Sequence, residues 1–126
     1  MTGLDKLTSA RKILLNKLLG EIKEEYLDDE RPILKITFFK GLVLYIRYND
    51  YDEYSYQLVF SQEPLDRIRY DNYDDMWEVN SKPHHFHPRG EKIAFESSMN
   101  GDPKHDISIL LKELLEKLFN EIRKID

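Results

Sequence analysis

The sequence predicts an α+β domain: an antiparallel meander sheet of four to five strands, flanked by N- and C-terminal helices packed on one face. Apolar residues recur at spacings of three and four at both ends of the chain, which is typical of amphipathic helices. The middle of the chain holds short runs of β-forming residues separated by glycine or proline. At 126 residues, we expect a single domain spanning residues 1–126.

The first helix is expected over residues 4 to about 26. Thr2 is placed to cap its start, with Asp5 following in the first turn. Pro32 ends the segment, because proline disfavours helical geometry in the residue before it. The apolar positions on which this helix rests are Leu4, Leu7, Leu14, Leu15, Leu18, Leu19, Ile22 and Tyr26.

Four strands are expected next, over residues 33–39, 42–49, 54–61 and 65–70. Lys40 and Gly41 form a two-residue hairpin between the first two, with glycine where a positive φ is needed. A short fifth strand is expected over 92–97. Asp102 and Pro103 then cap and begin the last helix. Its apolar face comprises Ile107, Leu110, Leu111, Leu114, Leu115, Leu118, Ile122 and Ile125.

Alternation along the strands gives the sheet one apolar and one polar face. The helices are expected to cover the apolar face, which leaves the polar face open. The polar face displays Tyr45, Arg47, Gln57, Arg69 and Asp71. A histidine-rich segment follows the fourth strand, and we expect it to fold back over this face.

Composition restricts the classes of function. The chain has no cysteine, which excludes disulfides, thiolate metal sites and cysteine nucleophiles. The net charge of −5 argues against a protein that coats nucleic acid non-specifically. The N-terminus has no uninterrupted apolar stretch typical of a secretory signal, so a cytoplasmic protein is expected. Abundant lysine and glutamate are typical of a thermophile-like composition.

The segment SKPHHFHPRGEK, residues 81–92, carries three of the four histidines within four positions. A metal site would draw on His84, His85, His87 and His105. The spacing matches no recognised zinc motif, and adjacent side chains of an extended chain point in opposite directions. We therefore predict no metal and no other cofactor. A hydrogen-bonded structural role is the remaining simple interpretation of these histidines.

The alternative to metal binding is acid–base chemistry on RNA. Cleavage by attack of the 2′-hydroxyl on its neighbouring phosphate needs a base, an acid and a cation near the phosphate. His85 and His87 are the predicted acid and base, with Asp71 as the third catalytic residue, orienting an imidazole. The predicted substrate-binding residues are Tyr45, Arg47, Gln57, Arg69, His84 and Arg89.

Three stretches of the chain resemble the TumE family. They are Tyr54-Ser55-Tyr56-Gln57, Arg69-Tyr70-Asp71-Asn72 and Pro83-His84-His85-Phe86-His87, followed by a leucine-rich terminal helix. The likeness extends from about residue 33 to the C-terminus. Family members often have extra proline and histidine after the second stretch, whereas this chain has Tyr73-Asp74-Asp75-Met76-Trp77 there.

The resemblance implies a toxin of a prokaryotic toxin–antitoxin module, whose partner is a protein antitoxin. Our leading hypothesis is a toxin that acts as a metal-independent endoribonuclease through its loop histidines, with RNA as the second partner. A non-catalytic protein-interaction module and a metal-dependent hydrolase are the alternatives. No membrane association is expected. An exposed strand edge or helix face would allow a homodimer.

Overall fold

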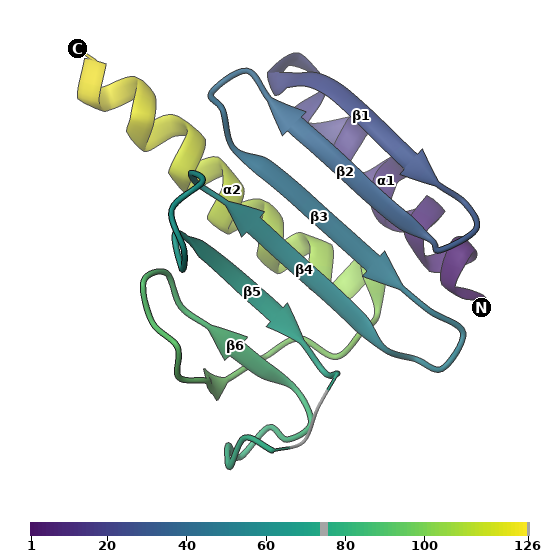
Figure 1. Ribbon diagram of the computed structural model, residues 1–126. Coiled ribbons are helices and arrows are strands. Elements are labelled where there is room, and N and C mark those ends of the chain that lie inside the picture. The colour runs from purple at the N-terminus through teal and green to yellow at the C-terminus, as the bar shows by residue number, and fades with distance from the viewer. Residues whose placement is uncertain (74–75, 126) are drawn as a thin grey trace.

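The computed structural model describes residues 1–73 and 76–125, apart from the side chains of residues 118–125. Within this part, seven strands form one antiparallel sheet in chain order, and two helices lie on one of its faces (Figure 1). The helices are α1 (Gly3–Leu18) and α2 (Pro103–Ile125). The strands are β1 (Ile22–Asp28), β2 (Ile33–Phe38), β3 (Val43–Tyr48), β4 (Tyr54–Val59), β5 (Arg67–Asp71), β6 (His85–His87) and β7 (Phe95–Glu96). The predicted α+β class is confirmed.

The prediction of one helix to residue 26 is wrong, because α1 ends at Leu18 and a 3₁₀ turn containing Gly20 leads into the edge strand β1. A register shift at the start of β1 twists the strand, so its less exposed residues are Ile22, Glu25 and Asp28. The error arose because Leu18, Ile22 and Tyr26 are four residues apart, as on one helix face, although Tyr26 is exposed on β1.

The sheet also has more strands than predicted. Besides β1, the histidine segment supplies β6, which pairs with β5 and extends the sheet instead of folding back over its polar face. The predicted strand at 92–97 is present but reduced to Phe95–Glu96. Three backbone-paired residues suffice to bring the histidines into register with β5.

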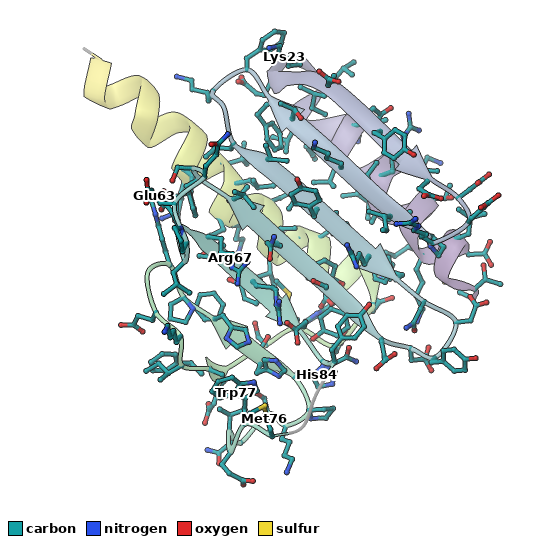
Figure 2. All side chains as sticks on the ribbon, in the orientation of Figure 1. Lys23, Glu63, Arg67, Met76, Trp77 and His84 are labelled. Atoms are coloured by element: carbon teal, nitrogen blue, oxygen red, sulfur yellow. The ribbon has the colours of Figure 1, made fainter. Side chains whose placement is uncertain are left out.

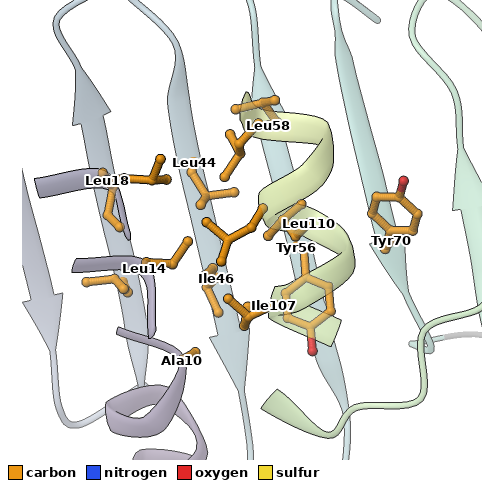
Figure 3. Packing of buried hydrophobic residues seen from close by; sticks show 14 of the residues in the cluster. Ala10, Leu14, Leu18, Leu44, Ile46, Tyr56, Leu58, Tyr70, Ile107 and Leu110 are labelled. Carbon is orange, nitrogen blue, oxygen red and sulfur yellow. The ribbon is translucent and has the colours of Figure 1, made fainter. Parts of the chain in front are cut away.

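The core lies between the apolar sheet face and the two helices (Figure 3). Leu14 and Leu18 of α1 and Ile107 and Leu110 of α2 pack there against β3 and β4, and each is almost fully buried. Burial of one such side chain contributes about 2 kcal/mol, so this layer holds the helices to the sheet. Among the residues that the structure describes, no helix covers the opposite face (Figure 1).

Helix α2 continues beyond the edge of the sheet at its C-terminal end (Figure 1). The predicted apolar residues Leu118, Ile122 and Ile125 fall where the side chains lie outside the described part of the structure. Among the residues described, no helix is both long and apolar enough to cross a membrane.

A buried polar chain joins the sheet to the start of α2. The Tyr56 hydroxyl donates to Oδ2 of Asp106 at 2.7 Å, so the Tyr48 hydroxyl, 2.9 Å away, donates to Tyr56. Burial is the main cause that raises the pKa of Tyr56, which keeps its hydroxyl a donor. The same carboxylate accepts the amide of Gly101, a residue at φ +90° where glycine avoids strain.

Replacing Tyr56 with Phe should lower the free energy of unfolding by about 2 kcal/mol, because it removes a donor from the fully buried Asp106 carboxylate. Urea unfolding followed by circular dichroism measures the change. Tyr26→Phe is the control, since Tyr26 is 62% exposed on β1 and should leave stability unaltered. Equal stability of both variants would show that the buried hydroxyl chain contributes nothing.

Candidate functional site

Strand register gathers the polar residues of the open face into two adjacent rows. Each row runs across β3, β4, β5 and β6, because directly paired residues of antiparallel strands point to the same side. The first row is Tyr45, Gln57, Arg69 and His87, and the second is Arg47, Ser55, Asp71 and His85. Residues far apart in the chain thereby become neighbours.

The rows border a shallow open depression of about 530 Å³ on the sheet. Its lining comprises Tyr45, Arg47, Ser55, Gln57, Val59, Arg69 and Tyr73. Partial burial is the main cause that raises the pKa of the Tyr73 phenol, so Tyr73 is a neutral hydrogen-bond donor at this rim. Two guanidinium groups among tyrosine, serine and glutamine side chains suit an anionic ligand with hydrogen-bonding groups.

A second depression, of about 210 Å³, adjoins the first and shares Arg69 with it. His87 lines this one, together with the cationic side chains of Arg67 and Lys92 and the acidic side chain of Glu91. Figure 2 shows Arg67 on β5, facing the viewer on the open face of the sheet. The two depressions therefore form a cation-bearing surface that passes directly over His87.

Asp71 is the fully buried centre of the site. Its Oδ2 accepts from Nε of Arg69, and its Oδ1 accepts the backbone amide of Tyr73 at 3.2 Å. Nε2 of His85 lies 2.7 Å from the same Oδ1. A buried carboxylate needs such compensation, because an unpaired charge in the interior is very costly.

The ring of His85 is held from both ends. Nδ1 lies 2.9 Å from the carbonyl oxygen of Pro83, and a carbonyl only accepts, so Nδ1 carries the proton. His87 stands next to it with perpendicular rings 4.9 Å apart. Trp77 packs against both imidazoles, with ring centres at 6.4 Å from His85 and 5.4 Å from His87.

Two of the predicted site residues lie elsewhere. His84 stacks on the buried ring of Tyr54 and is 2.8 Å from its hydroxyl, on the helix-covered side of the sheet. Arg89 lies over Phe60 and pairs with Asp66, whose pKa the guanidinium lowers. The structure therefore groups the other predicted residues and leaves these two outside the group.

His105, the fourth histidine of the metal alternative, is also remote from the cluster. It lies in the first turn of α2 and contacts Asp106 through Nδ1 at 2.7 Å. Among the residues described, the set able to hold a metal consists of Asp71, His85 and His87. A four-histidine site is therefore not formed.

Sequence reasoning missed Tyr73, Trp77, Arg67 and Lys92 as site residues. Arg67 has the same strand parity as Arg69, which was a usable signal. Trp77 offered no such signal, because only the packing of its segment brings its ring into contact with His85 and His87. Asp74 and Asp75, within the stretch that departs from the TumE pattern, lie outside the described residues.

Asp71→Ala should lower the free energy of unfolding by about 3 kcal/mol, because Arg69 loses its carboxylate partner and the Tyr73 amide loses its acceptor. Urea unfolding gives the energy, and fluorescence of the single tryptophan reports displacement of Trp77. Glu78→Ala, which removes an exposed ion-paired carboxylate, is the control and should change stability by less than about 1 kcal/mol. An unchanged Trp77 spectrum in Asp71→Ala would contradict this account of the site.

Comparison with known proteins gives a family for this arrangement. A family model described as Toxin TumE matches residues 11–125. No curated protein and no solved structure matches the chain. The matched region includes the second half of α1, β1 to β7 and all of α2, so the resemblance carried by residues 54–57, 69–72 and 83–87 is confirmed. The chain belongs to the TumE toxin family.

Proposed function

We propose that this chain, as the toxin of a toxin–antitoxin module, arrests growth by cleaving RNA at the open sheet face. Membership in the TumE family supports the role of toxin and implies an antitoxin partner. The observation that carries the proposal of RNA cleavage is the pair of cross-strand rows, which set two arginines beside two histidines and a buried carboxylate.

Arg47 and Arg69 are the groups suited to hold the phosphate, since guanidinium forks bind phosphate oxygens through paired hydrogen bonds. Gln57 lines the same depression and offers both a donor and an acceptor to a ribose or a base. Tyr45 supplies a partly exposed aromatic ring on which an unpaired base can stack. A single-stranded RNA segment is the substrate class that fits these groups.

Chemistry proceeds in this proposal without a metal. A base removes the proton of the 2′-hydroxyl, the 2′-oxygen attacks phosphorus, and an acid protonates the departing 5′-oxygen. The products are a 2′,3′-cyclic phosphate and a 5′-hydroxyl. His87 lines the second depression, and the buried ring of His85 stands next to it. Asp71 and the Pro83 carbonyl orient His85.

The histidine pair is tested by expression in a bacterial host. Wild-type protein should arrest growth and fragment RNA, and the purified enzyme should leave 2′,3′-cyclic ends in buffer containing a chelator. His85→Ala/His87→Ala should reduce the cleavage rate at least about 100-fold, because acid–base groups contribute that much. His105→Gln, a histidine substitution remote from the cluster, should stay toxic.

Each outcome bears on a different part of the proposal. Arrest by the folded double variant would remove the histidines from the mechanism and keep the toxin. Arrest by wild type without RNA fragments would overturn RNA cleavage and favour a toxin that acts only by binding. Fractionation of the same cells tests the expected cytoplasmic location, and size-exclusion chromatography of the purified protein tests the proposed homodimer.

Arg47→Ala should weaken binding of a short single-stranded RNA about tenfold and reduce the slope of log K against log salt by about 0.7, the value for one lost phosphate contact. Filter binding to the inactive double-histidine variant at several salt concentrations measures both quantities. Lys12→Ala, an exposed charge-matched change on α1, should preserve affinity and slope. An equal loss of RNA affinity in both variants would show that the protein attracts RNA through its overall charge and not through a site at Arg47.

A further inference from the structure

We infer that Asp71, His85 and His87 form a binding site for one divalent transition-metal ion of the zinc class. One ligand atom from each residue lies within 4.8 Å of those from the other two. Asp71 and His85 are almost completely buried, and His87 is half-buried beside the second depression. Two imidazoles and a carboxylate at a pocket wall are the ligand set of metal sites that keep open positions.

The contact between Nε2 of His85 and Oδ1 of Asp71 is stable only with a positive charge between the two atoms. Because Nδ1 of His85 donates to the Pro83 carbonyl, Nε2 of the neutral ring presents a lone pair. That atom is buried and lies 2.7 Å from Oδ1 of Asp71, without the alignment of a hydrogen bond. Two acceptor atoms repel at this distance unless a proton or a metal ion neutralises them.

The surrounding groups fix the ligands in the way that outer-shell partners do in metal sites. The Pro83 carbonyl sets the tautomer and orientation of His85. Arg69 holds the second carboxylate oxygen of Asp71, which leaves Oδ1 directed at the histidines. Trp77 covers both rings and limits access of water. The side chains of Asp71 and His85 are therefore already oriented before the ion binds.

The donor set selects the kind of ion. Imidazole nitrogens favour Zn²⁺ and its neighbours over Mg²⁺ and Ca²⁺, which prefer oxygen ligands. Ligands at about 2.0 to 2.1 Å from a tetrahedral ion lie about 3.3 Å apart, so His85 and Asp71 must separate by roughly half an ångström. Arg69 is paired with the same carboxylate, and its positive charge weakens the attraction between Asp71 and a metal ion. We therefore expect the bound ion to exchange with metal ions in solution.

Metal binding regulates the activity proposed above, and this consequence rests on that proposed function. The ion takes the nitrogen lone pairs that proton transfer requires, so Zn²⁺ occupancy inhibits RNA cleavage and a chelator restores it. The binding itself is independent of the reaction and is measured without RNA.

The test begins with Zn²⁺ alone. Metal-free wild-type protein should bind one equivalent in equilibrium dialysis with elemental analysis, and Trp77 fluorescence should change with the same stoichiometry. His87→Ala should lower the affinity at least about tenfold, as expected when a group of the site is removed. Asp71→Asn provides a second variant that keeps the shape of the side chain, and it should also lose affinity.

His84→Gln and His105→Gln are the matched controls, because each removes a histidine whose ring lies outside the cluster. Both should bind Zn²⁺ as tightly as the wild type. Absence of stoichiometric binding by the wild type would overturn the inference. So would binding that survives in His87→Ala and Asp71→Asn but is lost in either control.

Cleavage assays then separate this inference from the proposed function. Cleavage in chelator that stoichiometric Zn²⁺ suppresses supports both. Stoichiometric binding together with cleavage only when metal is added supports the site and replaces the metal-free mechanism with metal-dependent hydrolysis. Stoichiometric binding without RNA cleavage under either condition supports the site and overturns the proposed function.

Discussion

The arrangement of the open face depends on the buried carboxylate of Asp71. A charge with no exposure to solvent must be compensated from within the protein. Arg69 of the same strand and the amide of Tyr73 provide that compensation, and Nε2 of His85 lies 2.7 Å from the carboxylate. Because His85 belongs to β6, this contact adds to the backbone pairing that joins a strand of only three residues to β5. The pocket wall, the position of Trp77 and the placement of His87 follow from this attachment.

The two faces of the sheet differ in their role: one forms the core, and the other forms an open polar surface. The apolar face and both helices form the hydrophobic core. The polar groups buried there, Tyr48, Tyr56 and Asp106, form hydrogen bonds with one another. The open face has no covering layer, so its arginines and tyrosines can take part in binding. Substitutions of its exposed residues therefore change charge and shape with little effect on the core.

The proposed acid–base catalysis and the inferred metal binding use the same atoms of Asp71, His85 and His87. An imidazole nitrogen with a free lone pair accepts a proton or a metal ion, but not both at once. The carbonyl and carboxylate contacts that orient His85 favour either event, since both need a fixed tautomer.

The sequence by itself determined the α+β class, the two-faced sheet and the residues that form the polar face. These follow from local periodicity, so strand alternation alone assigns Arg47, Gln57, Arg69 and Asp71 to one side. Periodicity failed at β1, where Ile22 and Tyr26 continue the four-residue spacing of α1 although they lie on a strand. Only tertiary structure decided which histidines belong to the site, because strand pairing turns His85 and His87 toward Asp71 and His84 away. Trp77 likewise joins through packing, which leaves no local pattern in the sequence.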